Sequence, residues 1–437
     1  MKRRAIEKVV TLAATLALGA CGSDKSSTSS VCNGGSASNT CGAATVSGGG
    51  LLKDFTPPCD PGGGNVLLTA SGEVLALGGY AFPPQSSGDV AFVDGWEFVF
   101  DKVLVTFDHV RFSQNPFVSP TDQSKTGAPF AQVDGPWAVD LHKGGPYPGK
   151  GGGDEQAVGI AAIRCGFDQT QPYAFGFDAV PATRNAMNVN LDLSSTSTSD
   201  YADYQEMITK GYAVFYIGTA TWRGDQGGAS CIQADSGTAT PYDFSAGAGF
   251  PQVVKFRIGF ATPTSYSNCQ NPDNGSAGAF AGEEFVRGIQ VKPNASTIAQ
   301  VTFHTDHPLW DSIVHDSPLH FDQIAAQYVG ASGVPTATID QMVGVNFQAF
   351  TDASPSHKAL PWRYCSNNNG PDNTPFYSTN APQMRFDRLT VPYVLNGTDP
   401  AAALRDYRDF MNYNQSTQGH VNADGLCFVQ RHYPSPP

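Results

Sequence analysis

Residues 95–112 read GWEFVFDKVLVTFDHVRF and are rich in Val, Phe, Leu and Thr, with apolar residues at every second position. Because side chains alternate between the two faces of a strand, Trp96, Phe98 and Phe100 are expected on one face. Beyond Asp101 the apolar positions continue one residue out of step. This stretch therefore predicts one long strand with a β-bulge or a bend.

Shorter segments with the same pattern recur along the chain, separated by Gly- and Pro-rich turns. They are residues 66–68, 73–80, 131–141, 157–163, 173–180, 212–221, 253–261, 285–291 and 298–303. Helical patterns are few and are expected at 200–210, after Ser317-Pro318 and after Asp399-Pro400. Many short strands with few helices predict an all-β fold, an antiparallel β-sandwich with a few short helices and long loops held by disulfides.

The first 21 residues resemble the signal sequence of bacterial lipoproteins. A basic start at Lys2, Arg3 and Arg4 precedes an apolar run that is too short to span a membrane, and Leu18-Gly19-Ala20-Cys21 matches the lipobox. The resemblance implies cleavage before Cys21 and lipidation of its thiol. The protein would then be exported and anchored to the outer membrane, on its periplasmic or cell-surface face. An ordinary secretory signal with a chance cysteine is the alternative.

The charge composition of the chain limits the classes of partner that it is expected to bind. Residues 1–20 hold four of the 26 basic residues and one of the 39 acidic ones, which leaves 22 against 38 and a net charge near −16. So acidic a chain argues against nucleic acid or anionic lipid headgroups as partners, and suits cation binding. Contact with the membrane is expected through the lipid on Cys21.

Eight cysteines remain after Cys21, an even number that predicts up to four disulfides in an exported protein. The order of segments predicts a signal peptide over 1–20, a Ser/Gly-rich flexible tether over 21–64 and a β-sandwich over 65–300. A His-rich segment and a C-terminal region of helix and loop, residues 301–437, are expected to lie against the sandwich.

Residues 301–322, VTFHTDHPLWDSIVHDSPLHFD, hold four of the nine histidines. A strand end, a turn at Pro308 and two helix ends are expected there, and these can converge on one point. Imidazole and carboxylate groups are ligands for zinc and copper. The predicted transition-metal site, for copper or zinc, draws on His304, His307, His315 and His320, with Asp306 or Asp311 in addition.

Other interpretations remain open. The four imidazoles can instead be caps, core hydrogen-bonding groups or surface residues, in a sandwich that binds a partner or carbohydrate. His304-x-Asp306-His307 also resembles the end of the HxHxDH pattern of metallo-β-lactamase-like hydrolases, although Thr302 replaces the first histidine. A metal-dependent hydrolase is therefore a further alternative, but the sequence favours binding over catalysis. The other histidines, His420 included, are expected to be surface or hydrogen-bonded residues.

The order of several segments also resembles MbnP-like periplasmic copper-binding lipoproteins. These segments are DGWEFVFDKVLVTF, AVDL, YAFGFDAVP, YADYQEMITKGYAVFYIG and the SerAsnCys that ends at Cys269. The resemblance implies an exported, metal-binding β-sandwich. The WxW-type segment of that family is absent, with Tyr204 and Met207 in its place, so no ligand residue is carried over.

Overall fold

The computed structural model describes residues 44–45, 64–86, 89–92, 94–151, 156–163, 167–224, 230–233, 250–293, 295–310, 319–345, 363–366 and 406–432. Only the backbone is described for 44–45, 230–233 and 363–366. No helix in these ranges is both long enough and apolar enough to cross a membrane. The predicted signal peptide with Cys21 lies outside the described residues.

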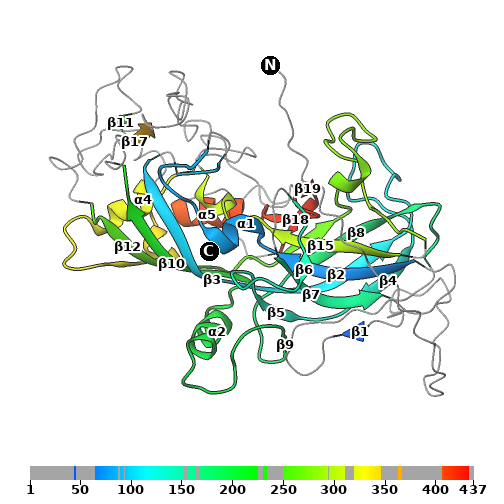
Figure 1. The fold of residues 1–437 in the computed structure, drawn as a ribbon, viewed down its shortest axis with the longest axis horizontal. Helices are drawn as coiled ribbons and strands as arrows, with labels where there is room; N and C mark the ends of the chain where they lie inside the picture. The colour runs from blue at the N-terminus through cyan, green and yellow to red at the C-terminus, as the bar shows by residue number, and fades with distance from the viewer. Residues whose placement is uncertain are drawn as a thin grey trace, which may run out of the picture.

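Strands dominate the described part of the chain (Figure 1). The strands are β1 (Ala44–Thr45), β2 (Asn65–Ser71), β3 (Trp96–Ser113), β4 (Pro129–Val133), β5 (Trp137–Asp140), β6 (Tyr147–Pro148), β7 (Gln156–Ile163), β8 (Pro172–Ala179), β9 (Met187–Asn188), β10 (Val214–Trp222), β11 (Ser230–Gln233), β12 (Val253–Phe260), β13 (Thr264–Ser267), β14 (Ile289–Gln290), β15 (Ser296–Phe303), β16 (Thr336–Thr338), β17 (Arg363–Ser366), β18 (Gly419–Val421), β19 (Gly425–Leu426) and β20 (Phe428–Arg431). The helices are α1 (Glu73–Gly78), α2 (Ser199–Lys210), α4 (Asp322–Ala325) and α5 (Tyr407–Gln415), with 3-10 turns η3 (Pro272–Asn274), η4 (His307–Leu309), η5 (Ala326–Tyr328) and η6 (Ile339–Met342).

The strands form two large sheets and one small one. The 7-stranded sheet has the order β1-β7-β2-β15-β18-β19, with β6 beside β7. In the 11-stranded sheet the main order of strands is β16-β12-β10-β3-β8-β13-β20, and the remaining strands pair at the sides of this path. The strand-rich fold with few helices is as predicted, but a strictly antiparallel arrangement is not. Three pairs, β2 with β15, β12 with β16 and β5 with β9, are parallel. Such pairs join segments distant in sequence and leave no hairpin signal.

The long strand predicted over 95–112 is confirmed as β3, which pairs with β10 and β8 in the middle of the larger sheet. Its predicted irregularity is also present. Lys102 lies opposite Ile217 while Phe100 lies opposite Gly218, so Asp101 is the extra residue of a bulge. The bulge lets the apolar residues on both sides of it face the same core.

Aromatic side chains join the two sheets. Phe303 at the end of β15 lies 6.1 Å from the ring of Phe107 on β3 and 5.8 Å from that of Phe177 on β8. All three side chains are buried. This contact fixes the end of β15 against the larger sheet, and the residues that follow β15 start from a rigid support.

Several predicted elements need correction. Residues 73–80, expected as a strand, form the one-and-a-half-turn helix α1. It ends at Gly79, where φ is +72° and an added Cβ would lie 2.2 Å from the carbonyl oxygen of Phe98, so only glycine lets the chain return against β3. Residues 131–141 are two strands, interrupted at the cis peptide before Pro136.

Of the three predicted helices, one is present as predicted, one is shorter and one is described only in part. α2 begins after Thr198, which accepts a hydrogen bond from the Tyr201 amide, and ends at Gly211 in the left-handed conformation, as expected. The helix expected after Pro318 is only the four-residue α4 followed by η5. Of the helix expected after Pro400, α5 from Tyr407 onward is present, and the residues before Asp406 lie outside the described part. Likewise only two residues of the strand over 285–291 are present, as β14.

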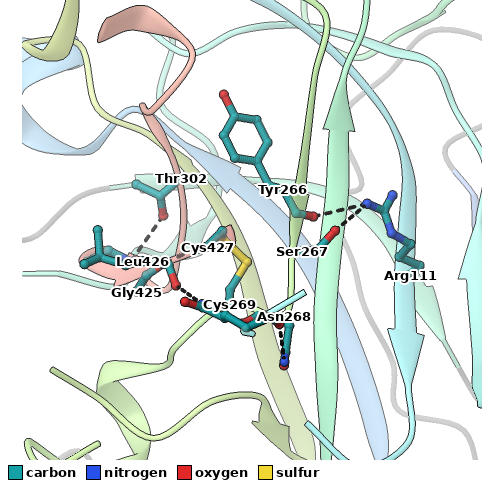
Figure 2. Close-up of a disulfide and its surroundings, with 11 residues drawn as sticks. Arg111, Tyr266, Ser267, Asn268, Cys269, Thr302, Gly425, Leu426 and Cys427 are labelled. Carbon is teal, nitrogen blue, oxygen red and sulfur yellow. Dashed lines mark hydrogen bonds between the residues drawn. A yellow bond between two sulfur atoms is a disulfide. The ribbon is translucent and has the colours of Figure 1, made fainter. Parts of the chain in front are cut away.

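The disulfide between Cys269 and Cys427 ties the end of β13 to the segment between β19 and β20 (Figure 2). The amide of Gln270 donates to the carbonyl of Leu426 beside it, at 2.8 Å. This part of the disulfide prediction is confirmed, and Cys231 and Cys365 face each other in the backbone register of β11 and β17. The other pairings and the domain boundaries stay predictions.

The start of α2 is fixed by a compact group of charges. Asp200 lies 2.7 Å from Lys102 Nζ and 2.6 Å from Lys143 Nζ, and its side chain is 8% exposed. Burial alone would raise the pKa of Asp200, but the hydrogen bonds from Lys102 and Lys143 outweigh it and lower the pKa to about 2.

We therefore expect Asp200 to contribute about 2 kcal/mol of stability that is present above pH 4 and is lost as the pH falls toward 2. The sign follows because the unfolded chain takes up the proton at a higher pH than the folded chain. Urea unfolding of the wild type and of Asp200→Asn between pH 7 and pH 2 measures this, and the difference between them should shrink on acidification. A constant difference across that range would contradict the assignment.

Candidate metal centre

The parallel register of β2 and β15 determines which residues meet at their carboxyl ends. Ser71 pairs with Thr302, so the residues two positions further on, Glu73 and His304, leave the sheet side by side. Glu73 Oε1 lies 3.5 Å from His304 Nε2. The backbone of Glu73 has φ of +59°, an uncommon conformation for a residue with a Cβ. This sharp start of α1 places the side chain of Glu73 beside His304, at the end of β15.

The antiparallel neighbour of β15 supplies a second imidazole. In β18 His420 pairs with Thr302, and the amide of His304 donates to the carbonyl of Gln418 at 3.0 Å. His304 and His420 are thus diagonal neighbours on one face of the sheet. Their rings stack with centroids 4.1 Å apart and planes 18° apart.

The third imidazole belongs to His307 in η4, the turn that follows β15 at Pro308. Its ring meets the other two edge to face, at centroid distances of 5.4 Å to His304 and 5.2 Å to His420. Its other side stacks on Trp310 at 3.8 Å. One ring nitrogen from each of the three histidines lies within 4.8 Å of the other two. His307 and His420 are fully buried, and the side chain of His304 is 11% exposed.

The tautomer of His307 is set by the loop between α5 and β18. The Thr417 hydroxyl donates to the carbonyl of Asn414 at 2.7 Å, and the same oxygen lies 2.8 Å from His307 Nδ1. Because the hydroxyl proton is already used, this oxygen accepts from Nδ1–H, which leaves the lone pair of the ring on Nε2. Thr417 thus acts on the site as a positioning residue.

If the three imidazoles hold zinc, replacing Thr417 with valine should lower the affinity about 10-fold to 100-fold, because an isosteric side chain without the acceptor no longer fixes the ring of His307. Competition with a chromophoric chelator measures the affinity. Thr209→Val is the matched control, since Thr209 is exposed on α2 and bonds only within its own helix. Equal affinities of wild type and Thr417→Val would show that Thr417 does not position the ring.

The electrostatics of the site favour a cation. Burial alone would lower the pKa of His304, but Glu73, Asp306 and Asp424 outweigh it and raise the pKa to about 9. The same negative charge acts on the phenol of Tyr80, whose pKa is raised well above its usual value by burial and by Asp306. The carboxylates around these imidazoles therefore stabilise positive charge among the rings, carried by a proton or by a metal ion.

The donor set fits a transition-metal ion. Nitrogens bound at 2.0–2.1 Å around a tetrahedral zinc ion lie about 3.4 Å apart, so from separations of up to 4.8 Å each ring would move inward by at most about 1 Å to hold it. Three imidazoles with a nearby carboxylate are nitrogen and oxygen donors, which zinc and copper(II) both accept. Buried rings suit retention of an ion more than turnover of a substrate, because catalytic metal sites keep an open position.

The structure brings together two of the residues predicted from the sequence, His304 and His307, with Asp306 close enough to act on the pKa of His304. His320 is not one of the three ligand candidates, although its amide donates to the carbonyl of Leu309 in η4. Its ring is buried beside Asp94, with Nδ1 3.7 Å from a carboxylate oxygen that also accepts the backbone amides of Phe321 and Asp322. His315 and Asp311 lie outside the described residues.

Sequence reasoning missed His420 and Glu73. His420 was expected to be a surface or hydrogen-bonded residue of the C-terminal loop, yet it is fully buried in β18. Glu73 was placed in a strand. No local signal marks either residue, because both reach the site through pairing with β15 across long separations in sequence.

The tryptophans offer no platform for carbohydrate in the described part of the chain; they are core residues, which is the interpretation that scattered aromatics in a sandwich favour. Trp96, Trp137, Trp222 and Trp310 are all buried, with at most 6% of each exposed. Trp362 lies outside the described residues. The described tryptophans are part of the core.

Comparison of the chain with models of protein families, with curated protein sequences and with solved structures gives no match.

Proposed function

We propose that this protein binds a transition-metal ion, copper or zinc, through His304, His307 and His420, with the carboxylate of Glu73 at the same point. The observation that carries the proposal is the convergence of three imidazoles, two of them fully buried, from the end of β15, from η4 and from β18. Sequestration or delivery of the ion is the function that such a site serves.

We further propose that the chain is exported and attached by lipid at Cys21 to the outer membrane. Export is supported by the lipobox and by the disulfide between Cys269 and Cys427, since disulfides persist outside the cytosol. The acidic net charge favours attachment through the lipid over contact of the protein surface with anionic headgroups. Mass spectrometry of the N-terminal peptide from the native host tests this. A diacylglyceryl-modified Cys21 is expected, and an unmodified cysteine would refute it.

Metal analysis tests the binding function directly. The protein, produced without a histidine tag, is loaded with copper(II) or zinc and dialysed against a weak chelator. One equivalent of one of the two metals should remain, and competition against chelators of known affinity then shows which metal is preferred. Protein that retains neither copper nor zinc after dialysis would overturn the proposal.

A further inference from the structure

A second group of metal-ligand side chains lies on the outer face of the larger sheet. In β3 the ring of Phe107 points inward to Phe303, so the next residue, Asp108, faces the opposite side. Immediately after it the pairing of β3 with β8 shifts register between Asp108 and Arg111. His109 lies in this bulge with φ of +48°, and its side chain is 45% exposed. The bulge thus sets an imidazole on an acidic, accessible surface.

The imidazole of His109 is held from behind by a carboxylate. Its Nδ1 lies 3.1 Å from Asp178 Oδ2 on the neighbouring strand, and its Nε2 lies 3.7 Å from Asp108 Oδ2. One ligand atom each from Asp108, His109 and Asp134 lies within 4.8 Å of the other two. A carboxylate that accepts from one ring nitrogen, with the other nitrogen directed at the ion, is the arrangement that orients histidine ligands in proteins.

The carboxylate of Asp108 is itself fixed. Its Oδ1 accepts the backbone amides of His109 at 2.7 Å and of Gly135 at 2.6 Å, which leaves Oδ2 toward the ring. Asp134 immediately precedes Gly135 in the turn between β4 and β5. One turn therefore both anchors Asp108 and supplies Asp134.

Charge in this group is unbalanced toward the negative. Asp108 and Asp178 are directly opposed in the register of β3 and β8, and like charges at such positions repel. The nearby cation is Arg111, which lies 2.8 Å from Asp178 Oδ1. Its other terminal nitrogen donates to the carbonyl of Tyr266 and to Ser267 Oγ, as Figure 2 shows. Arg111 therefore offsets one of three carboxylates.

We infer that Asp108, His109 and Asp134 form a second binding site for a divalent transition-metal ion that accepts nitrogen and oxygen donors, of which Zn²⁺ is the probe. Asp178 orients the imidazole and does not bind the ion. The site is exposed and its donors are one nitrogen and two carboxylates, so it binds more weakly and exchanges faster than the buried centre. It rests on none of the residues of the proposed function.

Calorimetric titration of the full, untagged chain with Zn²⁺ tests the inference. The wild type should bind two ions, one tightly and one more weakly. His109→Asn should lower the affinity of the weaker site at least 10-fold and leave the affinity of the tight site unchanged. Asparagine tolerates the backbone conformation of His109, so the fold is expected to persist. Asp134→Asn should act in the same direction. Asp101→Asn, which changes another exposed carboxylate of the same strand, is the control.

The outcomes separate the two sites. Loss of the weaker ion in His109→Asn and Asp134→Asn, with both ions kept in Asp101→Asn, supports the second site. His109→Asn and Asp134→Asn variants that bind as many ions as the wild type, with unchanged affinities, would overturn it. Substitution of His420 should remove only the tight ion, and retention of the weaker ion in that variant supports a separate second site.

Discussion

His420→Asn is expected to lower the affinity for zinc or copper(II) by more than about 100-fold, because it removes one of three imidazoles that meet at one point. Substitution of a residue that only orients a ligand already lowers metal affinity about 10-fold to 100-fold, and loss of the ligand itself lowers the affinity further. The measurement is competition with a chelator of known affinity, after circular dichroism has shown that the variant is folded.

A second measurement does not depend on the chelator. An ion that binds the folded chain at 100 times its dissociation constant raises the free energy of unfolding by about 2.7 kcal/mol. The wild type should show a shift of this size on addition of metal, and His420→Asn should show little. Both readouts follow the same equilibrium and should agree.

His320→Asn is the matched control. His320 is as deeply buried as His420, and it belongs to the His-rich segment 301–322 from which the sequence predicted the metal ligands. Its ring, however, lies beside Asp94 and is not one of the three that meet. Its replacement is expected to reduce stability while leaving metal affinity within about threefold of the wild type. If His320→Asn instead abolished binding and His420→Asn did not, the centre would be built as the sequence predicted and not as the structure indicates.

The sequence could predict the residues of this centre that are near one another in the chain, but not those that strand pairing brings to it. His304 and His307 are three positions apart, just after the end of β15, and both belong to the His-rich stretch that the sequence shows. His420 and Glu73 come from the neighbours of β15 in the sheet, and a neighbour over 100 residues away leaves no local trace. His320 was grouped with them because it is near in the chain, but its ring lies beside Asp94 and is not one of the three that meet.

The fold shows the same division. Alternation of apolar residues gave β3, β7, β8, β10 and β12 nearly to their ends, and the slip in that alternation gave the bulge at Asp101. In residues 73–80 the apolar residues from Val74 to Leu77 are consecutive, a pattern that does not distinguish a short strand from a helix, and the chain forms α1 there. The parallel pairs could not be predicted, since residue patterns inside a strand do not specify which neighbour it finds or in which direction.

Phe98→Ala is expected to have the largest effect on stability, a loss of about 3–5 kcal/mol in the free energy of unfolding. Phe98 is 1% exposed, and its ring lies within 4.0–6.2 Å of the rings of five residues from separate parts of the chain. These are Tyr80, Phe92, Phe100, Phe256 and Phe321. Alanine would leave a cavity where all five meet.

Val99→Ala tests whether that loss comes from the core and not from the strand itself. Val99 is the next residue of β3, points to the opposite face and is 45% exposed, so its truncation should change stability by at most about 0.5 kcal/mol. Urea unfolding of the two variants beside the wild type gives both values. Comparable losses would mean that pairing within β3, rather than burial of its aromatic face, holds the larger sheet. The expected difference instead assigns the stability of the sheet to the same alternation that identifies it in the sequence.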